Sequence, residues 1–148
     1  MKIALGSDHG GYELKGLIAE HLRARGFETV DFGSYDAERA EYPVYGEKAA
    51  RAVAAGECEL GVLICGTGCG ISLAANRVRG IRCCNCSEPV TARLSRRHNN
   101  CNMVALGGRI VGAETALSIV DAFVDSSFEA GGRHEQRVAM IEAINRNT

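Results

Sequence analysis

One segment of the sequence places a thiol directly beside a glycine-rich turn. Cys65 follows the apolar run 62–64, and residues 66–70 read Gly-Thr-Gly-Cys-Gly. Glycines let a backbone turn tightly and bring its N–H groups against a ligand, so this segment could hold a phosphate or stabilise an oxyanion. Such donors also favour a thiolate, which can serve as a base. A plain strand-to-helix turn with a buried cysteine is the alternative, and the glycine spacing fits neither a Walker A loop nor the dinucleotide fingerprint.

Two further pairs of polar residues have side chains suited to proton transfer or ligand binding. Asp8 and His9 follow the first apolar strand and precede two glycines, so both could face the same crevice. Asp8 could instead cap the following helix, with His9 exposed. His98 and Asn99 follow a basic helix end, and an imidazole is suited to pass a proton near neutral pH. A solvated histidine is the alternative at that position.

Three arginines are candidates for an anion clamp. Arg109 follows two glycines at the end of the fifth expected strand, and Arg133 and Arg137 are four residues apart. On a helix this spacing puts two guanidinium groups on one face, where they repel each other unless an anion lies between them. The alternative is a solvated basic face whose charge is offset by Glu135 or Glu142.

Apolar and polar segments alternate along the chain in the pattern of strands and helices. A helix that ends at Gly26 should bury one face, made of Leu14, Leu17, Ile18, His21 and Leu22. Strands are expected at 3–5, 27–32, 61–65, 80–84 and 103–106, and later helices at 43–55, 71–78, 89–97, 115–124 and 134–145. This alternation predicts a five-stranded parallel sheet with helices on both sides. Ligands bind such sheets beyond the carboxyl ends of the strands, which selects the segments 6–11, 65–70, 85–88 and 107–109.

Size and charge are those of an ordinary globular chain. The 148 residues fit one domain, and 17 basic residues stand against 18 acidic ones. The net charge of −1 indicates neither a nucleic-acid footprint nor a membrane-surface patch, so a bound anion needs a local site. No apolar run approaches the roughly 18 residues of a membrane span. Polar residues interrupt the N-terminal apolar segment too early for a signal peptide. We therefore expect a cytoplasmic protein.

The chain carries seven cysteines, at positions 58, 65, 69, 83, 84, 86 and 101. An odd number without a secretory signal predicts reduced thiols rather than a disulfide framework. Cys83 and Cys86 have zinc-ligand spacing, but no second pair follows, so they and Cys84 are expected to be buried strand thiols. A thiol redox or metal-binding protein is one rival interpretation. A nucleotide-binding module is another, although a fold type alone does not support it.

Taken together, these segments resemble the ribose-5-phosphate isomerase B family, within the wider group that includes the galactose-6-phosphate isomerase subunits. The resemblance covers essentially the whole chain and rests on seven motifs: Gly6-Ser7-Asp8-His9-Gly10-Gly11, Glu41-Tyr42-Pro43, Ile64-Cys65-Gly66-Thr67-Gly68-Cys69-Gly70-Ile71-Ser72, Ala74-Ala75-Asn76, Cys86-Ser87-Glu88-Pro89, Ser95-Arg96-Arg97-His98-Asn99 and Gly131-Gly132-Arg133-His134-Glu135-Gln136-Arg137-Val138. It implies a Rossmann-like three-layer α/β/α sandwich and one isomerase domain over residues 1–148. It also implies a homodimer whose sites use both subunits, with a tetramer as the alternative assembly.

The resemblance further implies the reaction and the catalytic residues. The family interconverts ribose 5-phosphate and ribulose 5-phosphate through an enediol, a step of the pentose phosphate pathway. Cys65 would take the C2 proton of the open-chain sugar and return it at C1. Thr67 would stabilise the enediolate, His98 would open the furanose ring, and Asp8 would handle a hydroxyl proton. No metal or cofactor is expected.

The binding residues follow from the same resemblance. Backbone amides of the loop would also stabilise the enediolate, and they belong to Gly66, Gly68, Cys69 and Gly70. The phosphate would be held by His9, Arg109, Arg133 and Arg137. Asn99 would bind sugar hydroxyl groups.

Two departures from the family pattern and one substrate question stay open. Glu41 stands where relatives often have aspartate, and Cys69 stands where they usually have an aliphatic residue. Cys69 lies four residues from Cys65, so the two thiols could form an oxidised pair. A hexose phosphate such as allose 6-phosphate is the alternative substrate, whereas a non-catalytic sugar-phosphate binder would have no need of Cys65.

Overall fold

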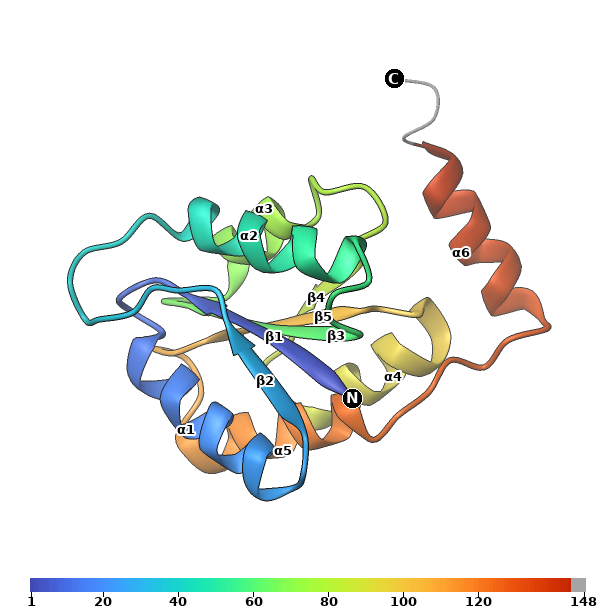
Figure 1. Cartoon of the computed structure of the whole chain (residues 1–148). Helices are drawn as coiled ribbons and strands as arrows, with labels where there is room; N and C mark the ends of the chain where they lie inside the picture. The colour runs from blue at the N-terminus through green and yellow to red at the C-terminus, as the bar shows by residue number, and fades with distance from the viewer. Residues whose placement is uncertain (145–148) are drawn as a thin grey trace.

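The computed structural model describes residues 1–144, in which strands and helices alternate for most of the chain (Figure 1). The strands are β1 (Lys2–Ser7), β2 (Glu28–Asp31), β3 (Leu60–Cys65), β4 (Cys83–Asn85) and β5 (Met103–Gly107). The helices are α1 (Tyr12–Ala24), α2 (Tyr42–Ala54), α3 (Cys69–Ala75), α4 (Pro89–Asn99), α5 (Ala113–Val124) and α6 (Arg133–Ile144).

The five strands form one parallel sheet in the order β2-β1-β3-β5-β4. Helices α2 and α3 cover one face, and α1, α4 and α5 cover the other (Figure 1). The expected three-layer α/β/α sandwich is confirmed. Because every strand runs in the same direction, the carboxyl ends of β1, β3 and β5 meet at one edge, on the left of Figure 1.

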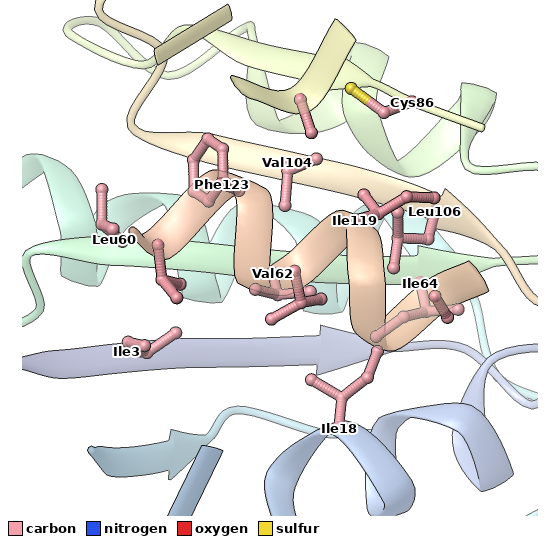
Figure 2. Close-up of a cluster of buried hydrophobic side chains, with 14 of the residues drawn as sticks. Ile3, Ile18, Leu60, Val62, Ile64, Cys86, Val104, Leu106, Ile119 and Phe123 are labelled. Carbon is pink, nitrogen blue, oxygen red and sulfur yellow. The ribbon is translucent and has the colours of Figure 1, made fainter. Parts of the chain in front are cut away.

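Side chains alternate between the two faces of the sheet, as the period of a strand requires. On β3, Val62 and Ile64 join the core under α1 and α5, whereas Leu63 and Cys65 join the core under α2 and α3. Figure 2 shows the first of these cores, in which Phe123 and Ile119 of α5 lie over the central strands. All six residues of β3 are buried, so the prediction that both faces of this strand are covered is confirmed.

The predicted inner face of α1 is partly wrong. Leu14, Ile18 and Leu22 are buried, but Leu17 is 47% exposed. Lys15 is buried instead, 2% exposed, because its ammonium group donates to Asp31 at 2.8 Å and to the carbonyl of Ser34. A hydrophobicity pattern cannot anticipate a lysine that is buried by pairing with a neighbouring strand.

Several element boundaries differ from the sequence prediction by two or three residues, among them the starts of β4 and α3. The fourth strand begins at Cys83 rather than at residue 80, because the Arg82 amide donates to the side chain of Asn102 and not to a strand partner. Helix α3 begins at Cys69, two residues early, since the turn that precedes it is completed within 66–68. The last helix was expected to reach Asn145, which lies outside the described residues.

Helix α6 stands apart from the sandwich, to the right of it in Figure 1. None of its residues from Arg133 to Ile144 is buried, and Met140 and Ile144 are 69% and 67% exposed. Its contacts with the sandwich include an ion pair of Glu142 with Arg82 at 2.6 Å and the stacking of His134 on His98 of α4. None of the helices among residues 1–144 is long and apolar enough to cross a membrane.

Strand β4 forms one edge of the sheet, and a side chain covers part of it. The amide of Asn76 donates to the Cys83 carbonyl at 2.9 Å and accepts from the Cys83 N–H at 2.8 Å. Cys83 and Cys84 are half-buried on this edge, and only Cys86 of the three neighbouring thiols is buried. The prediction of three buried strand thiols is therefore wrong for Cys83 and Cys84, because no further strand of the described residues covers the edge.

Candidate active site

Three segments meet at the carboxyl edge of the sheet, each directly after a central strand. The residue after β1, Asp8, donates its backbone N–H to the carbonyl of Ile64 at 3.3 Å. Gly108, after β5, donates to the Cys65 carbonyl at 2.8 Å, and Arg109 donates to the Gly66 carbonyl at 3.0 Å. The loops after β1, β3 and β5 are thus tied to one another by backbone hydrogen bonds. This edge is the one that the parallel topology predicts for a ligand.

Cys65 is the last residue of β3 and is 3% exposed. The Gly68 amide donates to its sulfur over 3.1 Å. Gly68 has a φ of 81°, a conformation that side chains rarely adopt, and this turn aims its amide back at the thiol. The hydrogen bond stabilises negative charge on sulfur, which a base at this position needs.

The loop amides are not all free to bind a ligand. The Gly68 amide is engaged by Cys65, and the Cys69 amide donates to the Thr67 hydroxyl at 3.2 Å. This differs from the expectation that every amide from 66 to 70 faces the substrate. The second bond fixes the Thr67 hydroxyl as an acceptor from the backbone, which leaves its own O–H available as a donor.

Two side chains that the sequence motifs do not indicate as site residues close around this loop. A Cβ at Gly70 would lie 2.6 Å from the Tyr42 ring, and a Cβ at Gly68 would overlap the Asn85 side-chain oxygen. Tyr42 begins α2 and Asn85 ends β4, so both neighbouring elements press on the loop. The glycines at 68 and 70 signalled a close neighbour, but a sequence alone cannot say which residue it is.

Asp8 is 7% exposed, and its Oδ1 accepts from the amides of Gly10 and Gly11 at 2.9 and 3.2 Å. Both amides precede α1, whose N-cap is Gly11 without a side-chain capping bond, so Asp8 stabilises the turn that leads into the helix and the capping alternative is wrong. His9 is exposed, and its Nδ1 accepts from the Ala40 amide at 3.2 Å. An accepting Nδ1 means that the neutral ring carries its proton on Nε2.

Arg109 lies over the glycine that follows Cys65. Its guanidinium is 3.6 Å from the point that a Cβ of Gly66 would occupy. A cavity of about 350 Å³ lies at the same edge of the sheet and is lined by His9, Gly10 and Gly108 among others, but not by Arg109. A larger cavity, of about 560 Å³, runs along α1 and β2 and includes none of the predicted site residues.

The remaining predicted residues lie elsewhere in the chain. His98 and Asn99 end α4, which starts after β4 at the carboxyl edge and returns toward the start of β5. Arg133 and Arg137 lie on α6, which contacts α4 and stands on the side of the sheet away from the carboxyl edge (Figure 1). Within one chain the fold separates Arg109 from Arg133 and Arg137, so a clamp that uses all three arginines requires a second subunit.

The second cluster is built around two stacked imidazoles. The rings of His98 and His134 are 4.2 Å apart and nearly parallel. Partial burial lowers the pKa of His134, and the neighbouring His98 and Arg133 lower it further. Glu129 lies within reach of both rings, so these three side chains could ligate a metal ion. Glu129 is already ion-paired with Arg97, however, and stacking accounts for the position of the two rings.

Arg133 and Arg137 have no carboxylate within ion-pair distance among residues 1–144. The two glutamates that could have offset them bind other groups. Glu135 accepts from the Gly131 amide at 2.7 Å, and Glu142 pairs with Arg82. Two exposed guanidinium groups on one helical face are thus left for an external anion.

Comparison with known proteins identifies the family of this chain. The model of the Ribose/Galactose Isomerase family matches residues 3–141, which is nearly the whole chain. The chain therefore belongs to this family, and the expected membership and isomerase class are confirmed.

Individual relatives indicate which members of the family this chain is most similar to among those compared. Ribose-5-phosphate isomerase B of Escherichia coli K12 is 54% identical over 143 residues, which cover 97% of this chain and 95% of the relative. Galactose-6-phosphate isomerase subunit LacB of Clostridium acetobutylicum is 38% identical over 99% of this chain and 85% of its own length. The structure of Clostridium thermocellum ribose-5-phosphate isomerase B has a TM-score of 0.97 at 52% identity and covers 99% of both chains.

Proposed function

We propose that this chain is an isomerase that interconverts ribose 5-phosphate and ribulose 5-phosphate. The observation that carries the proposal is the buried Cys65 thiol, held by the Gly68 amide at the carboxyl edge of the sheet. The relatives named above support the pentose over the hexose substrate, because the more similar of them are ribose-5-phosphate isomerases. Allose 6-phosphate is therefore the less favoured alternative.

The chemistry of an aldose–ketose conversion fits the residues at this edge. The Cys65 thiolate takes the C2 proton of the open-chain aldose, and the electron pair moves to form the C1–C2 double bond of an enediolate. The Thr67 hydroxyl donates to the oxygen on which negative charge develops. Asp8 moves the proton between the two sugar oxygens, and the Cys65 thiol then returns its proton to C1. Each proton that leaves one atom arrives at another, so no cofactor is needed.

The second cluster supplies the functions that the carboxyl edge lacks. In this proposal His98 opens the furanose ring, Asn99 binds sugar hydroxyls, and Arg133 and Arg137 hold the phosphate together with His9 and Arg109. Because one chain separates the two groups, we propose a homodimer in which α4 and α6 of one subunit face the Cys65 loop of the other. The exposed apolar side chains on α6 support this, since an interface would bury them. A tetramer built from such dimers is the alternative.

The same proposal extends to the domain and the compartment. One sheet with a core on each face supports a single isomerase domain over residues 1–148. Sugar phosphates are metabolites of the cytoplasm, where free thiols stay reduced, and the seven free cysteines fit that compartment.

The test is an assay of Cys65→Ala for conversion of ribose 5-phosphate to ribulose 5-phosphate, with EDTA present and allose 6-phosphate as a second substrate. A general base contributes about 10²–10⁴-fold, so kcat should fall by at least that lower amount. Cys58→Ala is the matched control, because Cys58 is also buried, 2% exposed, but lies before β3 at the opposite edge. This control should keep full activity.

The outcomes separate the parts of the proposal. Turnover of the hexose alone would overturn the substrate and keep the mechanism. Full activity of Cys65→Ala, or no turnover of either sugar by the unmodified protein, would overturn the assignment of the base or of the reaction.

A further inference from the structure

A second group of thiols lies away from the Cys65 loop, on the edge strand β4 and at the residue that follows it. The sulfur atoms of Cys84 and Cys86 are 3.3 Å apart, with the thiol of Cys86 donating to Cys84. Cys86 is 2% exposed, whereas Cys84 is half-buried. One partner is therefore accessible and the other is held beneath it.

Small molecules can reach Cys84 through a cavity of about 470 Å³ between β4, α4 and α6. Its wall includes Cys84, Ser95, Asn99 and Cys101, together with Ile141 of α6. Cys101 is itself buried, and its burial raises its pKa to about 11, so it is a poor nucleophile near neutral pH. Cys83 belongs to the core on the opposite face of the strand.

The surroundings of Cys84 favour its thiolate. The hydrogen bond from Cys86 lowers the pKa of Cys84 to about 7, against an opposing effect of burial. The same hydrogen bond and its own burial raise the pKa of Cys86, which stays protonated. Ser95 also lowers the pKa of Cys84, and Glu88 raises the pKa of Cys84. Oxidation of a thiol pair to a disulfide requires such an arrangement, in which a thiolate reacts with the oxidant and a neighbouring thiol then forms the disulfide.

We propose that Cys84 and Cys86 form a second reactive thiol site, which hydroperoxides oxidise to an intrachain disulfide. The Cys84 thiolate attacks one peroxide oxygen, the O–O bond breaks, and the departing oxygen takes a proton to leave as water or an alcohol. Cys84 then carries a sulfenic acid. The Cys86 sulfur attacks the Cys84 sulfur, the S–O bond breaks, and the Cys86 proton leaves with the oxygen as water. The two sulfurs lose two electrons and the peroxide gains them.

The position of this pair connects it to the Cys65 loop. Asn85 lies between the two cysteines, and its side-chain oxygen fills the space over Gly68. Gly68 donates the hydrogen bond to Cys65. A disulfide bond is about 2.0 Å long, so the two sulfurs must approach by about 1.3 Å and the tripeptide 84–86 must shift. Oxidation should therefore move Asn85 against the loop and lower the isomerase activity, an effect that rests on the function proposed above.

Labelling of thiols tests the site without an assay of activity. Reduced protein is treated with hydrogen peroxide, alkylated with N-ethylmaleimide and digested with trypsin. Peptide 83–93 holds Cys83, Cys84 and Cys86, and peptide 52–77 holds Cys58, Cys65 and Cys69. We expect the first peptide to fall from three labels to one and to regain three after dithiothreitol, while the second keeps three.

Single variants decide which thiols act. In Cys84→Ser the same peptide should keep both remaining labels under peroxide, and in Cys86→Ser a sulfenic acid should persist on Cys84 and be trapped by dimedone. Cys101→Ser is the matched control and should still form the disulfide. Three labels on peptide 83–93 after peroxide, or loss of labels from Cys65 and Cys69 instead, would overturn the proposed site.

The effect on the loop is measured on the same samples. Activity should fall several-fold in step with loss of label from peptide 83–93, and dithiothreitol should restore it. A complete disulfide with unchanged activity would overturn the link through Asn85 and leave the thiol site standing. An unmodified protein that never isomerises the sugar would overturn the proposed function, while the labelling result would still decide the site.

Discussion

At the scale of single residues, Gly68 meets two constraints, one of backbone conformation and one of space, that a residue with a Cβ atom does not meet. Its φ of 81° belongs to the left-handed region, and a Cβ there would overlap Asn85 and approach the Leu106 backbone at 2.8 Å. Its amide is also the donor to Cys65. Conformation, packing and the polarity of the thiol therefore depend on the same residue.

We predict that Gly68→Ala loses both stability and activity. A left-handed alanine costs about 1–2 kcal/mol, and the overlap with Asn85 adds to it, so urea unfolding should show a loss of at least about 1 kcal/mol. Displacement of the amide should lower kcat about tenfold or more. Gly16→Ala is the matched control, since Gly16 lies exposed in α1 with nothing within 4 Å of an added Cβ.

That control should stabilise the protein by up to about 1 kcal/mol, because alanine loses less backbone entropy in a helix than glycine, and should leave kcat unchanged. Equal stability of Gly68→Ala and the unmodified protein would contradict the constraint at Gly68.

The sequence predicts which residues lie at the site better than it predicts which side chains pack against them. Cys65 ends a strand, Asp8 and Arg109 follow strands, and parallel strands bring such positions to one edge. Asn85 and Tyr42 contact the loop through tertiary packing, which has no period or motif along the chain. The same limit explains Lys15, whose burial depends on Asp31 in a different element.

At the scale of elements, helix α4 depends on a cap at its first turn. Glu88 accepts from the amides of Val90 and Thr91 at 2.6 and 2.8 Å, and Pro89 stands at the first helical position. These hydrogen bonds, above all those with Thr91, lower the pKa of Glu88 from its ordinary value of 4.5. The cap positions the helix that ends in His98 and Asn99.

We predict that Glu88→Ala lowers the melting temperature, with a difference that depends on pH. A carboxyl whose pKa is lower in the folded state stabilises that state fully above its unfolded pKa of about 4.5. This stabilisation disappears as the pH falls further through the folded value. Scanning calorimetry from pH 7 to pH 3 should therefore show the two melting temperatures converging at the acid end.

Glu88→Gln separates the cap from the charge, because its side-chain oxygen still accepts but does not titrate. Its difference from the unmodified protein should be smaller than that of the alanine variant at pH 7. A Glu88→Ala difference that is constant over this pH range would show that the carboxylate does not act as inferred.

Element types along the chain were predictable because short continuous apolar runs, typical of parallel strands covered on both faces, alternate with segments whose apolar residues recur about every four positions. The boundaries of these elements were less predictable where a side chain takes the place of a backbone hydrogen-bond partner. At the start of β4, Asn102 takes the Arg82 amide, and the strand is shorter than its apolar residues suggest.

At the scale of the whole molecule, the two groups of site residues lie at opposite ends of the sheet. Topology predicts the first group from the sequence, whereas the place of α6 depends on only a few contacts, among them the Arg82–Glu142 pair. The sequence pattern of α6 gave no indication of where it would lie. In the proposed homodimer, each site takes Cys65 from one subunit and the arginines of α6 from the other.

Mixing two inactive variants tests this arrangement. Cys65→Ala lacks the base, and a double variant, Arg133→Ala with Arg137→Ala, lacks the phosphate ligands. After equal amounts are unfolded and refolded together, half of the dimers are mixed, and each mixed dimer has one intact site of two. We predict recovery of about a quarter of the unmodified activity.

Each variant refolded alone is the control and should stay inactive. Mixed dimers that are visible by native mass spectrometry but show no recovered activity would contradict a shared site.

The side chain of Asn76 has a consequence for the behaviour of the protein at high concentration. An edge strand with unpaired N–H and C=O groups is a template on which a strand of another molecule can add. Asn76 occupies both groups of Cys83 with its own amide, as a strand partner would. A chain that approaches β4 therefore finds its first pairing position taken, and one asparagine helps to keep the sheet from growing beyond its own molecule.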